Sequence, residues 1–277
     1  MTLNCRGRLV DLSTPKIMGI INATPDSFYS KSRVATSDDL KIRIEQMIAE
    51  GVDIIDIGAY SSRPNADHIS QEEELNRLLP LVEFIKKDYP GLLISIDTFR
   101  AKVANECIQR GVDLINDISG GQIDDELLEV IANKEVPYIL MHMRGTPQTM
   151  MQDTQYEHLT NELLHYFSKG IQKAKQTGVN DVIIDPGFGF SKTLEQNYQL
   201  LNQLDALNSL EVPMLIGISR KSMIYKALDS SADKALNGTT ALHMIALSKG
   251  ANILRVHDVK EAVECVKLHQ LINDSNP

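Results

Sequence analysis

The sequence has few cysteines, no excess of basic residues and no long apolar run. Cys5, Cys107 and Cys265 lie far apart and form no Cys-x-x-Cys pair, which argues against a zinc site or a disulfide framework and favours a reducing compartment. A net charge of -9 argues against a nucleic-acid surface, although a few cations in a cleft can still bind an anionic small substrate. No apolar run approaches the roughly 20 residues of a membrane span, and residues 1–12 lack the apolar core of a signal peptide. We therefore expect a cytoplasmic protein with no membrane or nucleic-acid partner.

What the sequence does contain is a repeated phrase, in which a short apolar run ends in a polar residue. Short apolar runs closed by turn residues are typical of buried parallel strands. The phrase occurs eight times, and its polar ends are separated by about one βα unit, roughly 30 residues or more, apart from one short interval. These ends are Asn22, Asp56, Asp97, Asn116, His142, Asp185, Ser219 and His257.

Apolar residues at helical spacing follow the runs, which predicts a (β/α)8 TIM barrel. A single barrel commonly has about 250 residues, close to the length of this chain. The rival doubly wound sheet is disfavoured because no Gly-x-Gly-x-x-Gly follows a run. We predict one domain over 1–277, with a short β-hairpin over 1–14 that closes the barrel floor and the barrel over 15–273. Helices are predicted from Ser37, from a capping box at Ser70 to Glu73, and over 101–110, 124–133, 156–177, 194–207, 238–248 and 259–271.

Arg255 and His257 lie two residues apart on the last run and so share one face of its strand. We interpret them as a cation pair for phosphate oxygens, because the last two units of such barrels often hold phosphate. The alternative is a structural pairing of Arg255 with a nearby carboxylate. Asn22 is a candidate Mg²⁺ ligand, since this ion often takes only one or two protein oxygens and completes its shell with substrate phosphate.

Asp97, Asn116 and Asp185 end three strands and should converge on one volume at the barrel mouth. Two carboxylates and an amide suit a heterocycle with a guanidine-like donor edge and an adjacent carbonyl. Buried carboxylates can also belong to structural ion pairs, and Asp56, deeper on its strand, is assigned such a scaffolding role.

Lys221 has three interpretations: a Schiff-base nucleophile, a donor to a ring carbonyl or nitrogen, or a solvated surface charge. Arg220 beside it points to the other side and is predicted to be structural. His142 is also assigned a structural rather than a catalytic role, because imidazole commonly serves structure.

Seven motifs, in the right order over nearly the whole chain, resemble the signatures of the dihydropteroate synthase family of pterin-binding barrels. They are Ile20-Ile-Asn-Ala-Thr-Pro-Asp-Ser-Phe28, Ser61-Ser-Arg-Pro64, Ser95-Ile-Asp-Thr98, Asn116-Asp-Ile-Ser-Gly-Gly121, Asp185-Pro-Gly-Phe-Gly-Phe190, Gly217-Ile-Ser-Arg-Lys-Ser222 and Arg255-Val-His257. The chain departs from the family pattern at Tyr60 (usually acidic), Ser62 (usually Thr) and Asn65 (commonly Gly). These departures bear on loop closure and on sulfonamide affinity, since sulfonamides mimic aminobenzoate in this family.

The resemblance implies an enzyme of folate biosynthesis that joins (7,8-dihydropterin-6-yl)methyl diphosphate to 4-aminobenzoate and releases diphosphate and 7,8-dihydropteroate. It implies Mg²⁺ as cofactor, a homodimer formed through the late helices, and closing loops at 24–33 and 61–67. The catalytic residues would be Asp97, Lys221, Arg255 and His257. The pterin would be bound by Asp97, Asn116, Ile118, Met141, Asp185, Phe190, Lys221 and Arg255. The diphosphate would be bound by Asn22 (also the metal ligand), Ser62, Arg63, Arg255 and His257, and 4-aminobenzoate by Phe28, Ser62, Pro64, Lys221 and Ser222.

Three other functions stay open. A methyltetrahydrofolate:corrinoid methyltransferase shares the pterin pocket but needs neither the pair of Arg255 and His257 nor the Ser-Arg-Pro loop. A non-catalytic pterin-binding paralogue is disfavoured by the intact loops, and an aldolase by the place of Lys221 after a turn. For the synthase we expect an SN1-like displacement, in which preorganised charges stabilise both the leaving diphosphate and the cationic dihydropterin.

Overall fold

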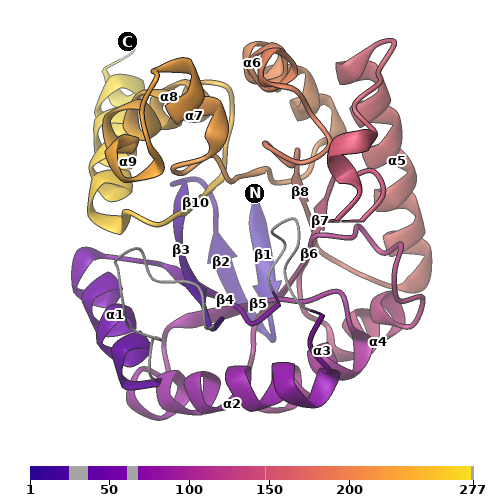
Figure 1. The fold of residues 1–277 in the computed structure, drawn as a ribbon. Helices are drawn as coiled ribbons and strands as arrows, with labels where there is room; N and C mark the ends of the chain where they lie inside the picture. Colours follow the sequence, from indigo (N-terminus) through magenta and orange to yellow (C-terminus); the bar gives the residue numbers. More distant parts are fainter. Residues whose placement is uncertain (25–36, 61–67, 147, 276–277) are drawn as a thin grey trace.

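Eight parallel strands form the central sheet of the protein, seen in a computed structural model that describes residues 1–24, 37–60, 68–146 and 148–275. Their order is β8-β7-β6-β5-β4-β3-β10-β9, and a parallel bridge between Ile184 and Met214 joins the two edges. The predicted (β/α)8 barrel is therefore confirmed, with its helices on the outside (Figure 1). The strands are β3 (Lys16–Asn22), β4 (Ile54–Gly58), β5 (Leu93–Asp97), β6 (Leu114–Asp117), β7 (Tyr138–Met141), β8 (Val182–Asp185), β9 (Leu215–Ile216) and β10 (Ile253–Val256).

Eight helices follow the predicted order, several with shifted ends, and the one predicted over 194–207 already ends at 202. A further helix over 222–227 was not predicted. The helices are α1 (Ser37–Glu50), α2 (Gln71–Asp88), α3 (Ala101–Gln109), α4 (Leu127–Lys134), α5 (Leu159–Thr177), α6 (Leu194–Asn202), α7 (Ser222–Ala227), α8 (Leu236–Ser248) and α9 (Val259–Asp274). Three 3₁₀ turns occur at η1 (Met150–Gln152), η2 (Leu204–Leu210) and η3 (Ala232–Lys234) among the described residues. Among these helices, none combines the length and the apolarity that crossing a membrane requires.

Local hydrogen bonds explain where the predicted bounds were wrong. The helix expected from residue 124 begins at Leu127, because the carboxylate of Asp124 accepts hydrogen bonds from the backbone N–H groups of Ala101 (2.8 Å) and Glu126 (3.1 Å). The capping box at Ser70 is only half formed: its hydroxyl accepts the N–H of Glu73, whose own carboxylate pairs with Arg77. The seventh strand is shorter than its apolar run, since only a single bridge holds its β8 side.

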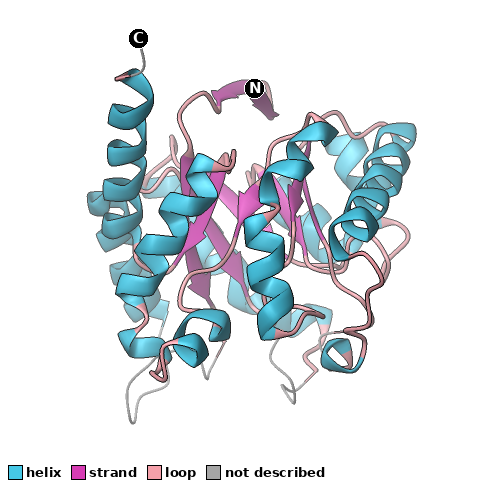
Figure 2. Ribbon diagram, turned by 90° about the horizontal axis from the view of Figure 1, so that it is seen from above, coloured by secondary structure: helices cyan, strands magenta, loops and turns pink. Residues whose placement is uncertain are grey.

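The barrel floor is a ring of one apolar side chain from each strand, namely Met18, Ile54, Leu93, Leu114, Ile139, Ile183, Leu215 and Ile253. All eight are nearly inaccessible to solvent. The antiparallel hairpin of β1 (Thr2–Cys5) and β2 (Arg8–Asp11) covers this ring and lies beyond one end of the barrel strands (Figure 2). Leu3, Cys5, Val10 and Leu12 pack against it, so the predicted floor plug is confirmed and the polar strand ends are left for the opposite mouth.

Candidate active site

The strand register brings the polar ends to one level of the barrel. Asn22 pairs with Gly58, Gly58 pairs with Asp97, and Asp97 pairs with Asn116 across three neighbouring ladders. Asp185 ends β8 opposite Met141 of β7. Because side chains alternate along a strand, these residues point inward above the apolar floor ring. The expected convergence at one mouth is what the fold produces.

Arg255 lies at the centre of this mouth and binds two carboxylates. Its Nε donates to Oδ2 of Asp56 at 2.6 Å, and its Nη2 donates to Oδ2 of Asp97 at 2.9 Å. Burial raises the pKa of Asp97 to about 7, against the lowering effect of Arg255 and together with the repulsion of Asp56. The pairing of Arg255 with a carboxylate, which was the structural alternative to phosphate binding, is therefore present. It connects the predicted pterin side of the mouth directly to the predicted phosphate side.

Three buried polar atoms beside this pair have no hydrogen-bond partner among the described residues. They are Oδ1 of Asp56, Oγ of Ser95 and Oδ1 of Asn116. Asn116 donates its Nδ2 to Oδ2 of Asp56 at 3.1 Å, which fixes its amide and aims the oxygen elsewhere. Buried polar atoms are nearly always paired with protein, water or ligand. This layer is therefore built to receive a polar molecule.

Asp185 and Lys221 face each other on the β8–β9 side of the mouth. Oδ1 of Asp185 accepts the N–H of Gly187 at 2.8 Å, while Nζ of Lys221 donates to the carbonyl of Phe188 and lies 4.7 Å from the ring centre of Phe190. Burial raises the pKa of Asp185, which Lys221 opposes. Burial likewise lowers the pKa of Lys221 to about 8. A carboxylate acceptor and an ammonium donor of opposite charge thus lie side by side.

His257 is held as a neutral imidazole. Its Nδ1 lies 3.3 Å from Oγ of Ser219, and its carbonyl accepts Nη2 of Arg43 from α1 at 2.6 Å. Burial and the neighbouring Arg255 lower the pKa of His257 to about 4. The predicted cation pair is thus one guanidinium and one neutral ring, because a second positive charge beside Arg255 is unfavourable. Arg220 forms a bidentate pair with Asp258, in agreement with the structural role predicted for it.

An apolar wall flanks the polar layer. Ile118, Met141 and Phe190, all predicted to contact the faces of a flat ring, belong to one cluster with Phe99, Met143, Met150 and Tyr60. Tyr60 packs edge-on against Phe99, with ring centres 5.1 Å apart. The polar layer and this apolar wall together suit a planar heterocycle with a polar edge.

The donors present fit Mg²⁺ only with help from a substrate. No group of three or more His, Cys, Asp or Glu side chains that could hold a metal occurs in the described parts of the chain. Asn22, at the end of β3, has an amide oxygen, a hard donor of the type that Mg²⁺ prefers. Such a site fits an ion that takes most of its oxygens from a bound diphosphate and water.

Comparisons with known proteins agree with this geometry. The "Pterin binding enzyme" family model matches residues 18–257. The dihydropteroate synthase of Haemophilus influenzae is 40% identical over 272 residues, 98% of each chain. The chain belongs to the dihydropteroate synthase family. The structure resembles the Yersinia pestis dihydropteroate synthase with a sulfonamide drug complex (TM-score 0.94, 39% identity, 99% of this chain and 100% of that one). It also resembles the Thermus thermophilus enzyme in complex with 4-aminobenzoate (TM-score 0.88, 35% identity, 98% and 100%).

Some family residues predicted from the sequence cannot be placed. Phe28, Ser62, Arg63 and Pro64 lie outside the described residues, as does the departure at Asn65. Ser222 begins α7 directly after Lys221, which places its backbone at the same side of the mouth.

Sequence reasoning gave no site role to three polar residues that the structure places at the family site. Ser95 lies two residues before Asp97 on the inward face of β5, so strand alternation could have assigned it to the site. Ser219 was predicted as a polar strand end, but its contact with His257 was not predicted. Arg43, whose side chain reaches from α1 to the carbonyl of His257, carried no such signal.

Proposed function

We propose that this protein joins (7,8-dihydropterin-6-yl)methyl diphosphate to 4-aminobenzoate, with release of diphosphate and 7,8-dihydropteroate, in folate biosynthesis. The observation that carries the proposal is the 2.9 Å hydrogen bond between Arg255 and Asp97. It joins a carboxylate suited to a pterin and a cation suited to diphosphate in one mouth. The names of the relatives support the same reaction, and the complex of the Thermus thermophilus enzyme with 4-aminobenzoate supports the amine substrate.

In this proposal the pterin edge is bound by the polar layer. Asp185 accepts hydrogen bonds from its guanidine-like N–H groups, and the orphaned Oδ1 of Asn116 accepts another. Lys221 donates to a ring carbonyl or nitrogen, which is one of its three initial interpretations. Ile118 and Met141 cover an apolar face of the ring. Each polar side chain thus supplies the hydrogen-bond donor or acceptor that complements a group on the pterin.

The difficult step is departure of diphosphate from the CH₂ group. Arg255 and the neutral imidazole of His257 donate hydrogen bonds to the leaving oxygens, while Asp97 and Asp185 stabilise positive charge that spreads over the dihydropterin. Charges fixed in advance at both ends of the breaking bond lower the barrier without reorganisation. Asn22 would hold Mg²⁺, which when bound would neutralise diphosphate charge. The amine of 4-aminobenzoate then attacks, in an SN1-like displacement with no covalent enzyme intermediate.

The test is aminobenzoate-dependent release of diphosphate by the wild type and by Asp97→Asn. The variant loses a charged hydrogen-bond acceptor, an interaction of about 1.5–3 kcal/mol, so kcat/KM should fall roughly 10- to 150-fold. Asp205→Asn, a change at an exposed carboxylate paired with Lys249, is the matched control. Release that depends on neither aminobenzoate nor Asp97 would defeat the proposal. Trapping of a Lys221 adduct by borohydride would instead support an aldolase.

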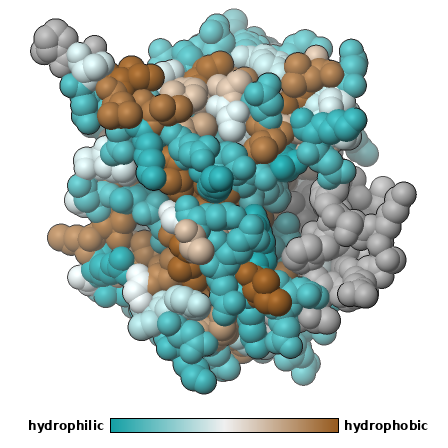
Figure 3. Space-filling view, turned by 90° about the vertical axis from the view of Figure 1, so that its left-hand side faces the viewer, coloured by the Kyte–Doolittle hydropathy of each residue, from teal (hydrophilic) through white to brown (hydrophobic). Residues whose placement is uncertain are grey.

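We also propose a cytoplasmic homodimer formed through α8 and α9. Apolar side chains gather on this face near the C-terminus (Figure 3), and Ile245, Leu268, Leu271 and Ile272 are between 41% and 66% exposed. Exposed apolar patches of this kind often mark protein contacts. All three cysteines are free and buried, which suits a reducing compartment. Leu271→Glu should shift the sedimentation of the protein from dimer to monomer, whereas Leu9→Glu, on the hairpin, should not.

A further inference from the structure

Lys192 is a buried lysine whose hydrogen-bond partners are all uncharged. Burial lowers its pKa to about 7, although the charge of Asp185 opposes this shift. Lys192 follows β8, two residues before α6, and is only 2% exposed. Its ammonium donates to the carbonyls of Gly187 and Phe190, both at 3.1 Å, and lies 3.0 Å from Nδ1 of His142. Burying an ammonium in this way is costly, and lysine is rarely buried without a paired charge. A lysine kept in such a place calls for an explanation.

The segment that Lys192 holds has little regular structure to support it. Gly187, Gly189 and Ser191 all have positive φ angles, of 68°, 81° and 49°. Glycine adopts positive φ readily, but the left-handed conformation of Ser191 persists only where the surroundings fix it. Side chains do this here, since Asn197 accepts the N–H of Gly189 at 2.7 Å and Lys192 binds two carbonyls of the same turn.

This segment, residues 187–190, carries or orients three groups of the proposed pterin site. The N–H of Gly187 fixes Oδ1 of Asp185, the carbonyl of Phe188 receives Nζ of Lys221, and the ring of Phe190 lies beneath that nitrogen. A shift of the segment would therefore move an acceptor, a donor and an aromatic face together.

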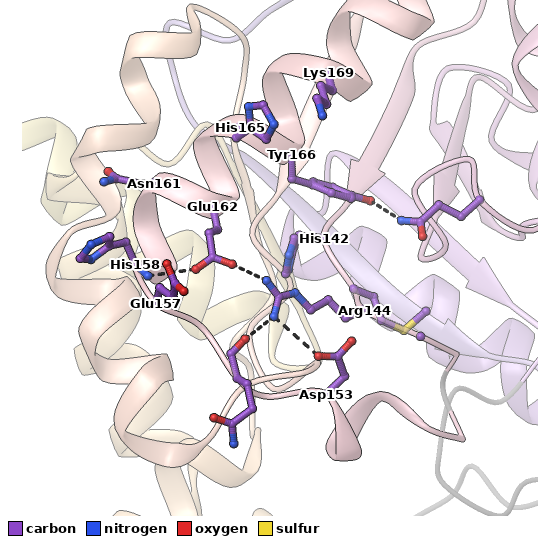
Figure 4. A pocket seen from close by; sticks show the side chains of 14 residues that line it. His142, Arg144, Asp153, Glu157, His158, Asn161, Glu162, His165, Tyr166 and Lys169 are labelled. Carbon is purple, nitrogen blue, oxygen red and sulfur yellow. Dashed lines mark hydrogen bonds and ion pairs between the residues drawn. The ribbon is translucent and has the colours of Figure 1, made fainter.

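His142, the residue after β7, completes the clamp. When Lys192 is protonated its ammonium can only donate, so Nδ1 of His142, 3.0 Å away, accepts and the neutral ring carries its proton on Nε2. Burial and the charge of Lys192 lower the pKa of His142 to about 2, so the ring remains an acceptor. The ring packs edge-on against Tyr166 (4.8 Å between centres) and lies in the wall of a groove of about 870 Å³ between α5 and the segment after β7 (Figure 4). Its role as a structural histidine agrees with the prediction.

We propose that Lys192 is a positioning residue of the pterin site, which acts by clamping residues 187–190 through the carbonyls of Gly187 and Phe190. This inference rests on the proposed function. It adds to the site a residue that touches neither substrate nor the reacting atoms. The clamp positions groups on the pterin side of the mouth. It does not contact the diphosphate side, around Arg255 and His257.

The test compares Lys192→Met, which keeps the length of the side chain and removes its donors, with the wild type. Calorimetric affinity for 7,8-dihydropteroate should fall about ten-fold or more, and KM for the pterin diphosphate should rise by a similar factor. The change in kcat should be smaller, and the inhibition constant of inorganic diphosphate should stay within about two-fold. Lys192→Arg, which keeps charge and donors, should recover most of the pterin affinity.

Lys249→Met is the matched control, because Lys249 donates to the carbonyl of Asn202 (2.7 Å) far from the mouth. The inference is overturned if folded Lys192→Met binds dihydropteroate as tightly as the wild type. It is equally overturned if pterin and diphosphate binding fall together, since that result marks a general structural role. If Lys192→Met does not fold, Lys192→Gln takes its place under the same criteria. A wild type that binds no dihydropteroate would instead refute the proposed function.

Discussion

Replacing Gly217 with alanine adds one methyl group to the floor of the proposed pterin site. The new Cβ would lie 3.9 Å from Oδ2 of Asp185, 3.9 Å from Nζ of Lys221 and 4.0 Å from Cβ of Arg255. These are ordinary van der Waals distances, and the glycine has no positive φ angle that alanine would strain. The free energy of unfolding should therefore change by less than about 0.5 kcal/mol.

Ligand binding should respond much more strongly. The methyl group would stand between Asp185 and Lys221, which we propose hold the pterin, and Arg255, which we propose binds the diphosphate. The pterin ring would therefore have to shift away from this position. Overfilling a packed site typically costs about 1–3 kcal/mol. For binding this corresponds to roughly 5- to 150-fold weaker affinity for 7,8-dihydropteroate.

Calorimetric titration with 7,8-dihydropteroate measures this effect, and thermal denaturation shows that the variant is folded. Gly91→Ala is the matched control, because its added Cβ would meet nothing within 4 Å. A folded Gly217→Ala with wild-type affinity would mean that the pterin does not lie on this floor, and the assigned pocket would be wrong.

Three further predictions follow from charges and packing. The pH profile of kcat/KM should be bell-shaped, with its maximum between about 7 and 8. Burial raises the pKa of Asp97 to about 7, so its carboxylate forms as the pH rises through that value. Burial lowers the pKa of Lys221 to about 8, so its ammonium is lost above that value. Glu74→Gln should cost about 3–5 kcal/mol of stability, because it leaves the buried guanidinium of Arg100, 2.6 Å away, without its charge partner. Leu3→Ala should cost about 2–5 kcal/mol by opening a cavity beneath the barrel floor. Diphosphate release across the neutral range checks the first, and denaturant unfolding checks the other two.

Exposed counterparts separate these effects from general damage. Glu73→Gln breaks a pair with Arg77 at a carboxylate that is 48% exposed and should change stability by no more than about 1 kcal/mol. Leu9→Ala, at a hairpin residue that is 72% exposed, should be nearly neutral. Stability losses in these counterparts as large as those of Glu74→Gln and Leu3→Ala, or a flat pH profile, would contradict the corresponding argument.

The sequence was informative wherever a residue's role follows from strand periodicity. Short apolar runs ending at Asn22, Asp97 and Asp185 predicted the barrel and its mouth, because inward side chains at the carboxyl ends of parallel strands must meet. Periodicity predicts the face of the sheet on which a side chain lies, but not the residues that it contacts. It could not show that Asp97 and Asp56 share Arg255, since those contacts depend on rotamers and on the curvature of the closed sheet.

Lys192 is a residue whose role could not be predicted from the sequence. In the sequence it is a lysine in a loop, which is usually a solvated charge. Its burial follows from backbone carbonyls that turn inward at Gly187 and Phe190, and these have no side-chain signature. The predicted helix start at Asp124 was wrong for a related reason: its carboxylate was expected to begin its own helix and instead accepts the first N–H of α3.

The hairpin that seals the barrel also sets an order of events for the newborn chain. Its four apolar residues are synthesised well before Ile253, which belongs to the surface that they bury against. No partial barrel can complete that surface, so the plug must wait until almost all of the polypeptide has been made. Contacts between such distant segments slow folding, and the apolar side of the hairpin stays exposed until the strand that carries Ile253 is in place.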